Sequence, residues 1–257
     1  MMKGTNKRKR SALDLILAVG IICCAVFLCI EPIKNWQTER EQERIRALAE
    51  QTQEAETELV TTADETEETT KAYDSPIDFE ELRKINPDIV AWLKIPGTKI
   101  DYPVVQTTDN ETYLKKTFEG ATSAEGTVYL DCDSDGSLMG HHSIIYGHHM
   151  KNKSMFTDIV KFKEKDFFDQ HREIILYTPE RELHLKTVAA LYGDADGEKR
   201  RTKFASQEKM NEYLDVQTQK CSFRELPKGD VKQIYSFVTC SYEFENARTI
   251  LYAVNEE

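Results

Sequence analysis

Three side chains suited to acyl transfer stand at the ends of predicted β-strands. Cys240 ends one predicted strand, Arg248 begins the next, and His148 follows another strand directly after a glycine. A cysteine thiolate is a strong nucleophile, an imidazole carries protons near neutral pH, and a guanidinium donates hydrogen bonds to a developing oxyanion. These residue types are the inventory of a cysteine acyl transferase, provided that the fold brings them together.

Short strands must position these residues. A segment without Gly or Pro, residues 204–220, predicts one helix, and residues 78–86 predict another that Pro87 ends. Eight short strands with little helix between them predict a mainly β fold, a closed or nearly closed barrel. If its last two strands form an antiparallel hairpin, Cys240 and Arg248 become neighbours at one end of the sheet. The predicted strands are residues 90–95, 99–105, 126–131, 143–146, 173–178, 183–193, 233–240 and 249–254.

Three motifs in this order resemble those of class B sortases. The stretch SFVTC at residues 236–240, followed by Arg248, resembles the TLxTC…R signature of sortases. Residues 146–156 (YGHHMKNKSMF) resemble the histidine segment of class B, and residues 92–106 (WLKIPGTKIDYPVVQ) resemble its opening strands. Ser236 and Phe237 replace the usual Thr and Leu, yet every catalytic group is present. The resemblance extends over residues 77–254.

The resemblance implies both a fold and an activity. The fold is a sortase-type eight-stranded β-barrel with N-terminal helices and one helix inserted before the last two strands. The activity is that of a cysteine transpeptidase, which cleaves a C-terminal cell-wall sorting signal after a Thr through a thioacyl-enzyme. The protein is then transferred to an amine of peptidoglycan.

The family's roles map onto three residues of this chain. Cys240 attacks the Thr carbonyl, His148 protonates the departing amine and later accepts a proton from the incoming amine, and Arg248 binds the oxyanion. The implied partners are secreted surface proteins that bear the sorting signal and a lipid-linked peptidoglycan precursor. No metal or organic cofactor is implied.

The N-terminal segment predicts a membrane anchor. Residues 15–30 are sixteen consecutive residues without a charge. With their flanks they form the stretch 12–33, which as a helix rising about 1.5 Å per residue is just long enough to cross a bilayer. No small-x-small cleavage site directly follows, and a helix apolar all round is not typical of a soluble core. Five basic residues before it predict a cytoplasmic tail, residues 1–11, and an extracytoplasmic catalytic domain. We therefore expect a single-pass protein of the cell membrane, as suits a Gram-positive cell.

Residues 34–75 predict a charged, partly disordered stalk that leads to a sortase catalytic domain at residues 76–257. Residues 39–50 are rich in helix formers, whereas residues 51–70 hold seven acidic residues, no basic residue and no aromatic residue. Such a segment buries too little apolar area to offset its ordering entropy. A functional acidic tail is the alternative. The net charge of the chain, −11, argues against nucleic acid as a partner.

Two clusters have alternative interpretations as metal sites. Four histidines within residues 141–149 could bind zinc together with Cys132, but adjacent histidines point to opposite faces of a strand. Asp131, Asp133 and Asp135 copy the start of a calcium loop, yet His142 stands where that loop requires Glu. A polar turn is the favoured interpretation, and we expect no metal.

The cysteines leave one question open. Cys132, Cys221 and Cys240 lie beyond the anchor, an odd number in a compartment that allows disulfides, so at least one thiol is free. Cys132 and Cys221 could pair, although free thiols are the favoured hypothesis for both.

Two other functions use the same fold. A membrane-tethered cysteine protease would pass the acyl group to water instead of an amine, and a non-catalytic surface scaffold would have a dispensable thiol. The sorting motif, the acceptor amine, the oligomeric state and the choice among anchoring, haem-uptake and pilus roles stay open.

Overall fold

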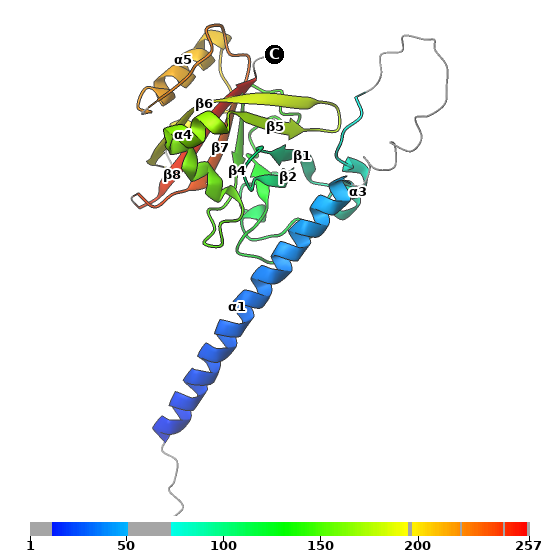
Figure 1. Cartoon of the computed structure of the whole chain (residues 1–257), viewed down its shortest axis with the longest axis vertical. Coiled ribbons are helices and arrows are strands. Elements are labelled where there is room, and N and C mark those ends of the chain that lie inside the picture. The colour runs from blue at the N-terminus through cyan, green and yellow to red at the C-terminus, as the bar shows by residue number, and fades with distance from the viewer. Residues whose placement is uncertain (1–11, 51–72, 195–196, 222, 244, 256–257) are drawn as a thin grey trace, which may run out of the picture. The chain divides into compact units, whose positions relative to one another are not determined.

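The computed structural model describes residues 12–50, 73–194, 197–221, 223–243 and 245–255. The chain divides into two compact units, Met1–Glu41 and Gln42–Glu257. Within the second unit all eight predicted strands are present and form a closed barrel in the order β1-β2-β3-β4-β7-β8-β6-β5 (Figure 1). The mainly β prediction is thereby confirmed. The strands are β1 (Ile89–Lys94), β2 (Asp101–Val105), β3 (Val128–Leu130), β4 (His142–Tyr146), β5 (Glu173–Tyr177), β6 (Glu182–Asp194), β7 (Ile234–Cys240) and β8 (Ala247–Asn255).

Both predicted helices of the barrel unit are present. In α3 (Phe79–Ile85) the Asp78 side chain caps the first turn by accepting from the Glu81 backbone N–H at 2.9 Å. The inserted helix before the last two strands is α5 (Gln207–Thr218), which lies on the outside of the barrel (Figure 1). Four short helical segments were not predicted, because each is only three to eight residues long: η1 (Thr112–Leu114), η2 (Phe156–Lys163), α4 (Lys165–Gln170) and η3 (Gly197–Arg200).

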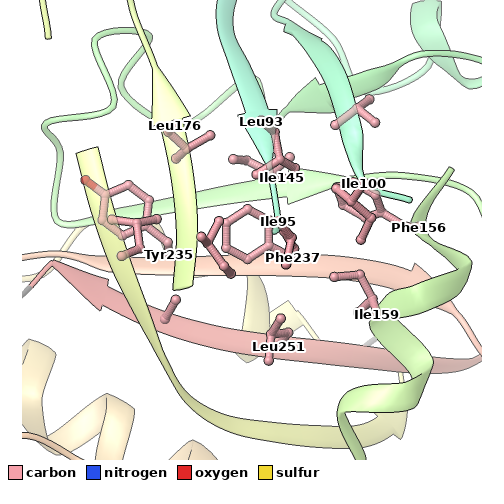
Figure 2. Close-up of a cluster of buried hydrophobic side chains, with 14 of the residues drawn as sticks. Leu93, Ile95, Ile100, Ile145, Phe156, Ile159, Leu176, Tyr235, Phe237 and Leu251 are labelled. Carbon is pink, nitrogen blue, oxygen red and sulfur yellow. The ribbon is translucent and has the colours of Figure 1, made fainter. Parts of the chain in front are cut away.

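The barrel interior is filled with apolar side chains. Figure 2 shows Leu93, Ile145, Phe237 and Leu251 converging from β1, β4, β7 and β8, and each is fully buried. The η2 segment adds Phe156, also fully buried. Burying each such side chain contributes about 1.5–3 kcal/mol, so this interior holds the strand ends that carry the site in fixed positions.

The helix α1 (Ala12–Glu50) ends in residues that belong to the barrel unit. Ile45 and Ala49, one turn apart, are buried in a cluster with Phe79, and the Arg46 Nε donates to the Asp101 carbonyl at 2.8 Å. Residues 42–50 therefore pack as part of the barrel unit, which differs from the stalk predicted over residues 34–75. The reason is the i, i+4 spacing of Ile45 and Ala49, which gives an otherwise polar helix one apolar stripe.

In the part of the chain that the structure describes, no helix is both long enough and apolar enough to span a membrane. The anchor predicted for residues 12–33 stays a prediction. The predicted cytoplasmic tail, residues 1–11, and the acidic segment, residues 51–70, lie outside the described residues.

Candidate active site

Cys240 and Arg248 lie directly opposite each other at one end of the barrel. The strands β7 and β8 pair antiparallel with Cys240 in register with Arg248, which confirms the predicted hairpin. A hydrogen bond of 2.9 Å from the Ser241 N–H to the Ala247 carbonyl continues the ladder into the loop. Cross-strand partners share one face of a sheet, so the thiol and the guanidinium project to the same side. The Cys240 thiol is free and half-buried.

His148 reaches the same end through a different strand. The strand β4 pairs parallel with β7, with Tyr146 in register with Val238, and the Gly147 N–H extends this pairing to the Val238 carbonyl at 3.1 Å. His148 follows directly, beside the last residues of β7. Strand pairing thus brings all three predicted site residues to one edge of the barrel, as the sequence hypothesis required.

The His148 ring is held by one hydrogen bond. Its Nε2 lies 2.8 Å from the Leu114 carbonyl oxygen at the end of η1. A carbonyl can only accept, so Nε2 carries the hydrogen, and the Nδ1 of the neutral ring is left as the basic nitrogen. The next residue, His149, donates from Nδ1 to the Cys240 carbonyl at 3.0 Å and so joins the histidine segment to the nucleophile's own backbone.

Two glycines allow this arrangement. Gly126 has φ +59°, and a Cβ there would lie 2.4 Å from the Tyr113 carbonyl oxygen and 2.8 Å from that of Leu114, the acceptor for His148. A Cβ on Gly147 would lie 2.5 Å from the Phe156 ring. Only glycine permits the backbone at both positions to approach so closely.

Two tyrosines that the sequence hypothesis missed lie on the strands next to the site, and one of them is close enough to interact electrostatically with Cys240. Tyr129 of β3 and Tyr146 of β4 are in register and stack with ring centroids 5.1 Å apart. Burial, together with the negative charges of Asp131 and Cys240, raises the pKa of Tyr129 to about 12, while the positive charge of Arg248 acts in the opposite direction. Tyr129 is therefore a neutral phenol within electrostatic reach of Cys240 and Arg248. Nothing in the sequence distinguished Tyr129 from the other aromatic residues in the predicted strands.

The other histidine of β4 has a structural role. His142 is buried, its Nδ1 donates to the Arg201 carbonyl at 2.7 Å, and its Nε2 lies 2.7 Å from the Ser236 hydroxyl. Burial lowers the pKa of His142 to about 4, so the ring is neutral and accepts from Ser236. This bond gives the buried hydroxyl at position 236 a partner.

The possible metal ligands are arranged differently from the zinc hypothesis. Among the described residues, the group able to hold an ion is Asp131, Cys132 and Asp133, and it contains no histidine. The Arg200 guanidinium contacts both carboxylates, at 2.6 Å to Asp131 and 2.7 Å to Asp133. A fixed cation already stands where the calcium interpretation would place an ion.

The other two cysteines of the barrel unit are not paired. Cys132 and Cys221 are both free and half-buried. Burial raises the pKa of Cys221 to about 11, which keeps that group a protonated thiol and a poor nucleophile at neutral pH. Free thiols were the favoured hypothesis for these two residues.

Comparisons with known proteins agree on one family. The family model described as "Sortase domain" matches residues 93–256. The chain is 29% identical over 163 residues to the Sortase B of Staphylococcus aureus, covering 63% of this chain and 67% of that protein. It is 29% identical over 177 residues to the Sortase B of Listeria monocytogenes, covering 68% and 72%. The crystal structure of Clostridium perfringens Sortase B matches with a TM-score of 0.65 and 31% identity, covering 69% of this chain and 99% of that one.

Proposed function

The chain belongs to the sortase family of cysteine transpeptidases, which anchor surface proteins to the cell wall, and we propose that Cys240, His148 and Arg248 are its reacting groups. The observation that carries this proposal is the register of β7 and β8, which sets Cys240 opposite Arg248. The parallel pairing of β4 with β7 adds an imidazole at the same edge. A nucleophile, a fixed cation and a proton carrier at the ends of three separate strands are the parts that acyl transfer needs.

The first half of the reaction forms a thioacyl-enzyme. The Cys240 thiolate attacks the carbonyl carbon of a Thr in the sorting signal, and the carbonyl π electrons move onto oxygen. Arg248 donates hydrogen bonds to that oxyanion, a contribution of roughly 3 kcal/mol when one such donor is removed from an enzyme. The C–N bond then breaks, and protonated His148 gives its Nδ1 proton to the departing amine.

The second half transfers the acyl group. An amine of the lipid-linked peptidoglycan precursor attacks the thioester carbonyl and passes a proton to His148 Nδ1, which the first half left basic. The C–S bond breaks, an amide forms and the Cys240 thiolate leaves, so the enzyme returns to its starting protonation state. The Leu114 carbonyl holds the ring in one tautomer through both halves.

Membrane attachment completes the proposal. The uncharged stretch of residues 15–30 and the basic residues before it support a single span with a cytoplasmic N-terminus. The catalytic domain would then lie outside the cytoplasm, near substrates that are themselves held at the membrane. Tethering raises the effective concentration of the enzyme for both substrates.

Intact-mass spectrometry of the full chain in mild detergent tests the chemistry. The protein is incubated with a panel of Thr-containing sorting peptides, with and without an amine acceptor. We expect a mass increase that Cys240→Ala abolishes and Cys221→Ala preserves, because the two variants remove one thiol each and only one is the nucleophile. Amine should discharge the adduct and give a ligated peptide.

Other outcomes identify the alternatives. Discharge by water at the same rate with and without amine would support the cysteine protease. A folded wild-type protein that forms no adduct with any peptide, and whose Cys240 resists a thiol-reactive vinyl sulfone, would support the scaffold.

Cell fractionation tests the location. In a Gram-positive host the full chain should sediment with membranes, stay there at alkaline pH, and lose its catalytic domain to protease added outside the cell. Recovery in the soluble fraction would overturn the anchor.

A further inference from the structure

A buried carboxylate that the proposed reaction does not use lies beside the histidine segment, residues 146–156. Glu125 stands between η1 and β3, and only 1% of it is exposed. Its Oε2 accepts a hydrogen bond from Gln42 Nε2 at 3.1 Å, and its Oε1 accepts one from Asn152 Nδ2 at 2.8 Å. A charge so deeply buried is stable only when hydrogen bonds replace its lost water. Glu125 therefore joins the end of α1 to the loop that carries His148.

The backbone around Glu125 also runs along the residues that hold the histidine ring. Two backbone hydrogen bonds, each of 3.0 Å, join residues 123–127 to residues 113–115. The middle residue of the second stretch is Leu114, whose carbonyl accepts from His148 Nε2 at 2.8 Å. A shift of Glu125 would therefore move the acceptor of the ring as well as the loop that bears it.

The histidine segment has a strained backbone at Met155. This residue has φ +55° and ψ −133°, a conformation that persists only where surrounding contacts fix it. Met155 is buried, its N–H donates to the Tyr102 hydroxyl at 3.0 Å, and its Sδ lies 3.5 Å from Gln42 Nε2. The next N–H, that of Phe156, donates to the His148 carbonyl at 2.9 Å. Contacts that hold Met155 therefore hold the backbone of His148.

The last turns of α1 give Gln42 a fixed position. One turn after Gln42, the Arg46 Nε donates to the Asp101 carbonyl at 2.8 Å. The Arg46 guanidinium also lies 5.0 Å from the centroid of the Tyr102 ring, and Tyr102 is the residue that accepts from Met155. The end of α1 thus reaches the histidine segment through two neighbouring contacts.

We propose that Gln42 and Glu125 are positioning residues that tie the end of α1 to the histidine segment and so fix the place and the tautomer of the His148 ring. The pair acts on proton transfer and leaves the binding of the sorting peptide unchanged. The inference rests on the proposed transpeptidation. If that function fails, the wild-type protein forms no thioacyl adduct. If this inference fails, the variants keep the wild-type signals of the His148 ring, which are recorded without substrate.

NMR of the histidine ring nitrogens in the full chain tests the positioning directly. The spectra are recorded in mild detergent at alkaline pH, where the rings are neutral and each tautomer has its own pair of nitrogen shifts. In the wild-type protein the Leu114 carbonyl selects the Nε2–H form of His148. For Gln42→Ala and Glu125→Gln we expect a mixture of the two tautomers. His142 is the internal reference, because it donates from Nδ1 to a different carbonyl and should keep the Nδ1–H form.

Steady-state kinetics with a sorting peptide that forms an adduct gives a second measurement. For Gln42→Ala we expect kcat to fall about tenfold and KM to stay within about twofold of wild type, because the lost hydrogen bond goes to a charged group that supports only the proton carrier. Amide hydrogen exchange at Met155 and Phe156 should become faster. Glu43→Ala is the matched control, since it removes an exposed side chain from the same turn of α1. Alanine favours helix at both positions, and the control should keep the wild-type kcat and ring spectrum.

Exchanging the two side-chain types makes the assignment specific. Gln42→Glu alone brings two carboxylates together and should be worse than Gln42→Ala. Glu125→Gln alone leaves one acceptor oxygen for two donors and should also lower kcat. When the two changes are combined, the carboxylate at position 42 accepts from the amide at position 125, so the hydrogen bond forms in the reverse direction. The combined variant should recover a kcat within about threefold of wild type, above both single variants.

Three results would overturn the inference. One is a folded Gln42→Ala protein, verified by its melting curve, that keeps the Nε2–H form of His148 and a kcat within about twofold of wild type. Another is a combined variant no more active than the worse of its two single variants, since the two side chains would then not act through one hydrogen bond. The third is an equal effect of Glu43→Ala, which would mean a general disturbance of α1.

Discussion

Replacing Gly126 by alanine should disturb His148, the proposed proton carrier, from a distance. Gly126 has φ +59°, and its added Cβ would lie 2.4 Å from the Tyr113 carbonyl oxygen and 2.8 Å from the Leu114 carbonyl oxygen. Both atoms are backbone, so the η1 segment must move. The Leu114 carbonyl that moves is the one that accepts from His148 Nε2 at 2.8 Å.

The size of the effect follows from two contributions. An L-residue in the left-handed region costs about 1–2 kcal/mol, and forcing atoms into a packed site costs about 1–3 kcal/mol more. For a domain of this size the sum lowers the melting temperature by about 10 °C. Weakening the His148 hydrogen bond, a net interaction of about 1 kcal/mol, should lower kcat by roughly five- to tenfold.

Gly120→Ala is the matched control. Gly120 also has a positive φ, +91°, but a Cβ there would meet nothing within 4 Å. It should therefore show only the backbone cost, about 1–2 kcal/mol, with normal turnover. Thermal melts followed by circular dichroism and peptide turnover on both variants give the comparison. If Gly126→Ala has the same melting temperature as Gly120→Ala and turns over peptide at the wild-type rate, the link from Gly126 through Leu114 to His148 is refuted.

Three other predictions concern the site and its support. Arg248→Lys should lose activity on the order of a hundredfold, close to Arg248→Ala, because an ammonium cannot reproduce a planar fork of donors; near-normal turnover with Lys would show that charge alone suffices. The pKa of His142 is lowered from 6.5 to about 4, so the unfolded chain binds a proton that the folded chain does not, and the free energy of unfolding should fall by about 3 kcal/mol between pH 6.5 and pH 4. Urea titrations of His142→Gln should not show this fall in the free energy of unfolding. If the variant shows the same fall, other groups cause it. Gly147→Ala places a Cβ 2.5 Å from the Phe156 ring. This variant should lower kcat with little change in KM, because it shifts His148 and leaves the contacts with the peptide unchanged. A rise in KM with an unchanged kcat would contradict this.

Much of the fold was predictable because its signals are local. Alternating apolar residues and turn residues mark each strand, and all eight predicted strands overlap observed ones. The segment 204–220 became α5, shorter at both ends because Ser206 caps its start and the last turn ends at Thr218. The short helices η2 and α4 were not predicted, because segments of eight and six residues are too short to show a helical periodicity.

The site divides in the same way. Cys240 and Arg248 are joined by a short hairpin, so their proximity follows from two neighbouring strands and the turn between them. The position of His148 beside them depends on β4 pairing parallel with β7, strands that are far apart in the chain. A parallel pair needs a long crossover, and no local pattern states which strands it joins.

The sequence by itself therefore determined the strands and the proximity of Cys240 to Arg248, since these depend on side-chain alternation and on one turn. Only the tertiary structure decided which distant groups support them. The contact between Asp131 and Arg200 and the packing of Ile45 against the barrel unit each join segments that no turn connects. Such contacts form because burying apolar area and pairing a buried charge become favourable only once the whole barrel has closed. No local stretch of residues predicts that closure.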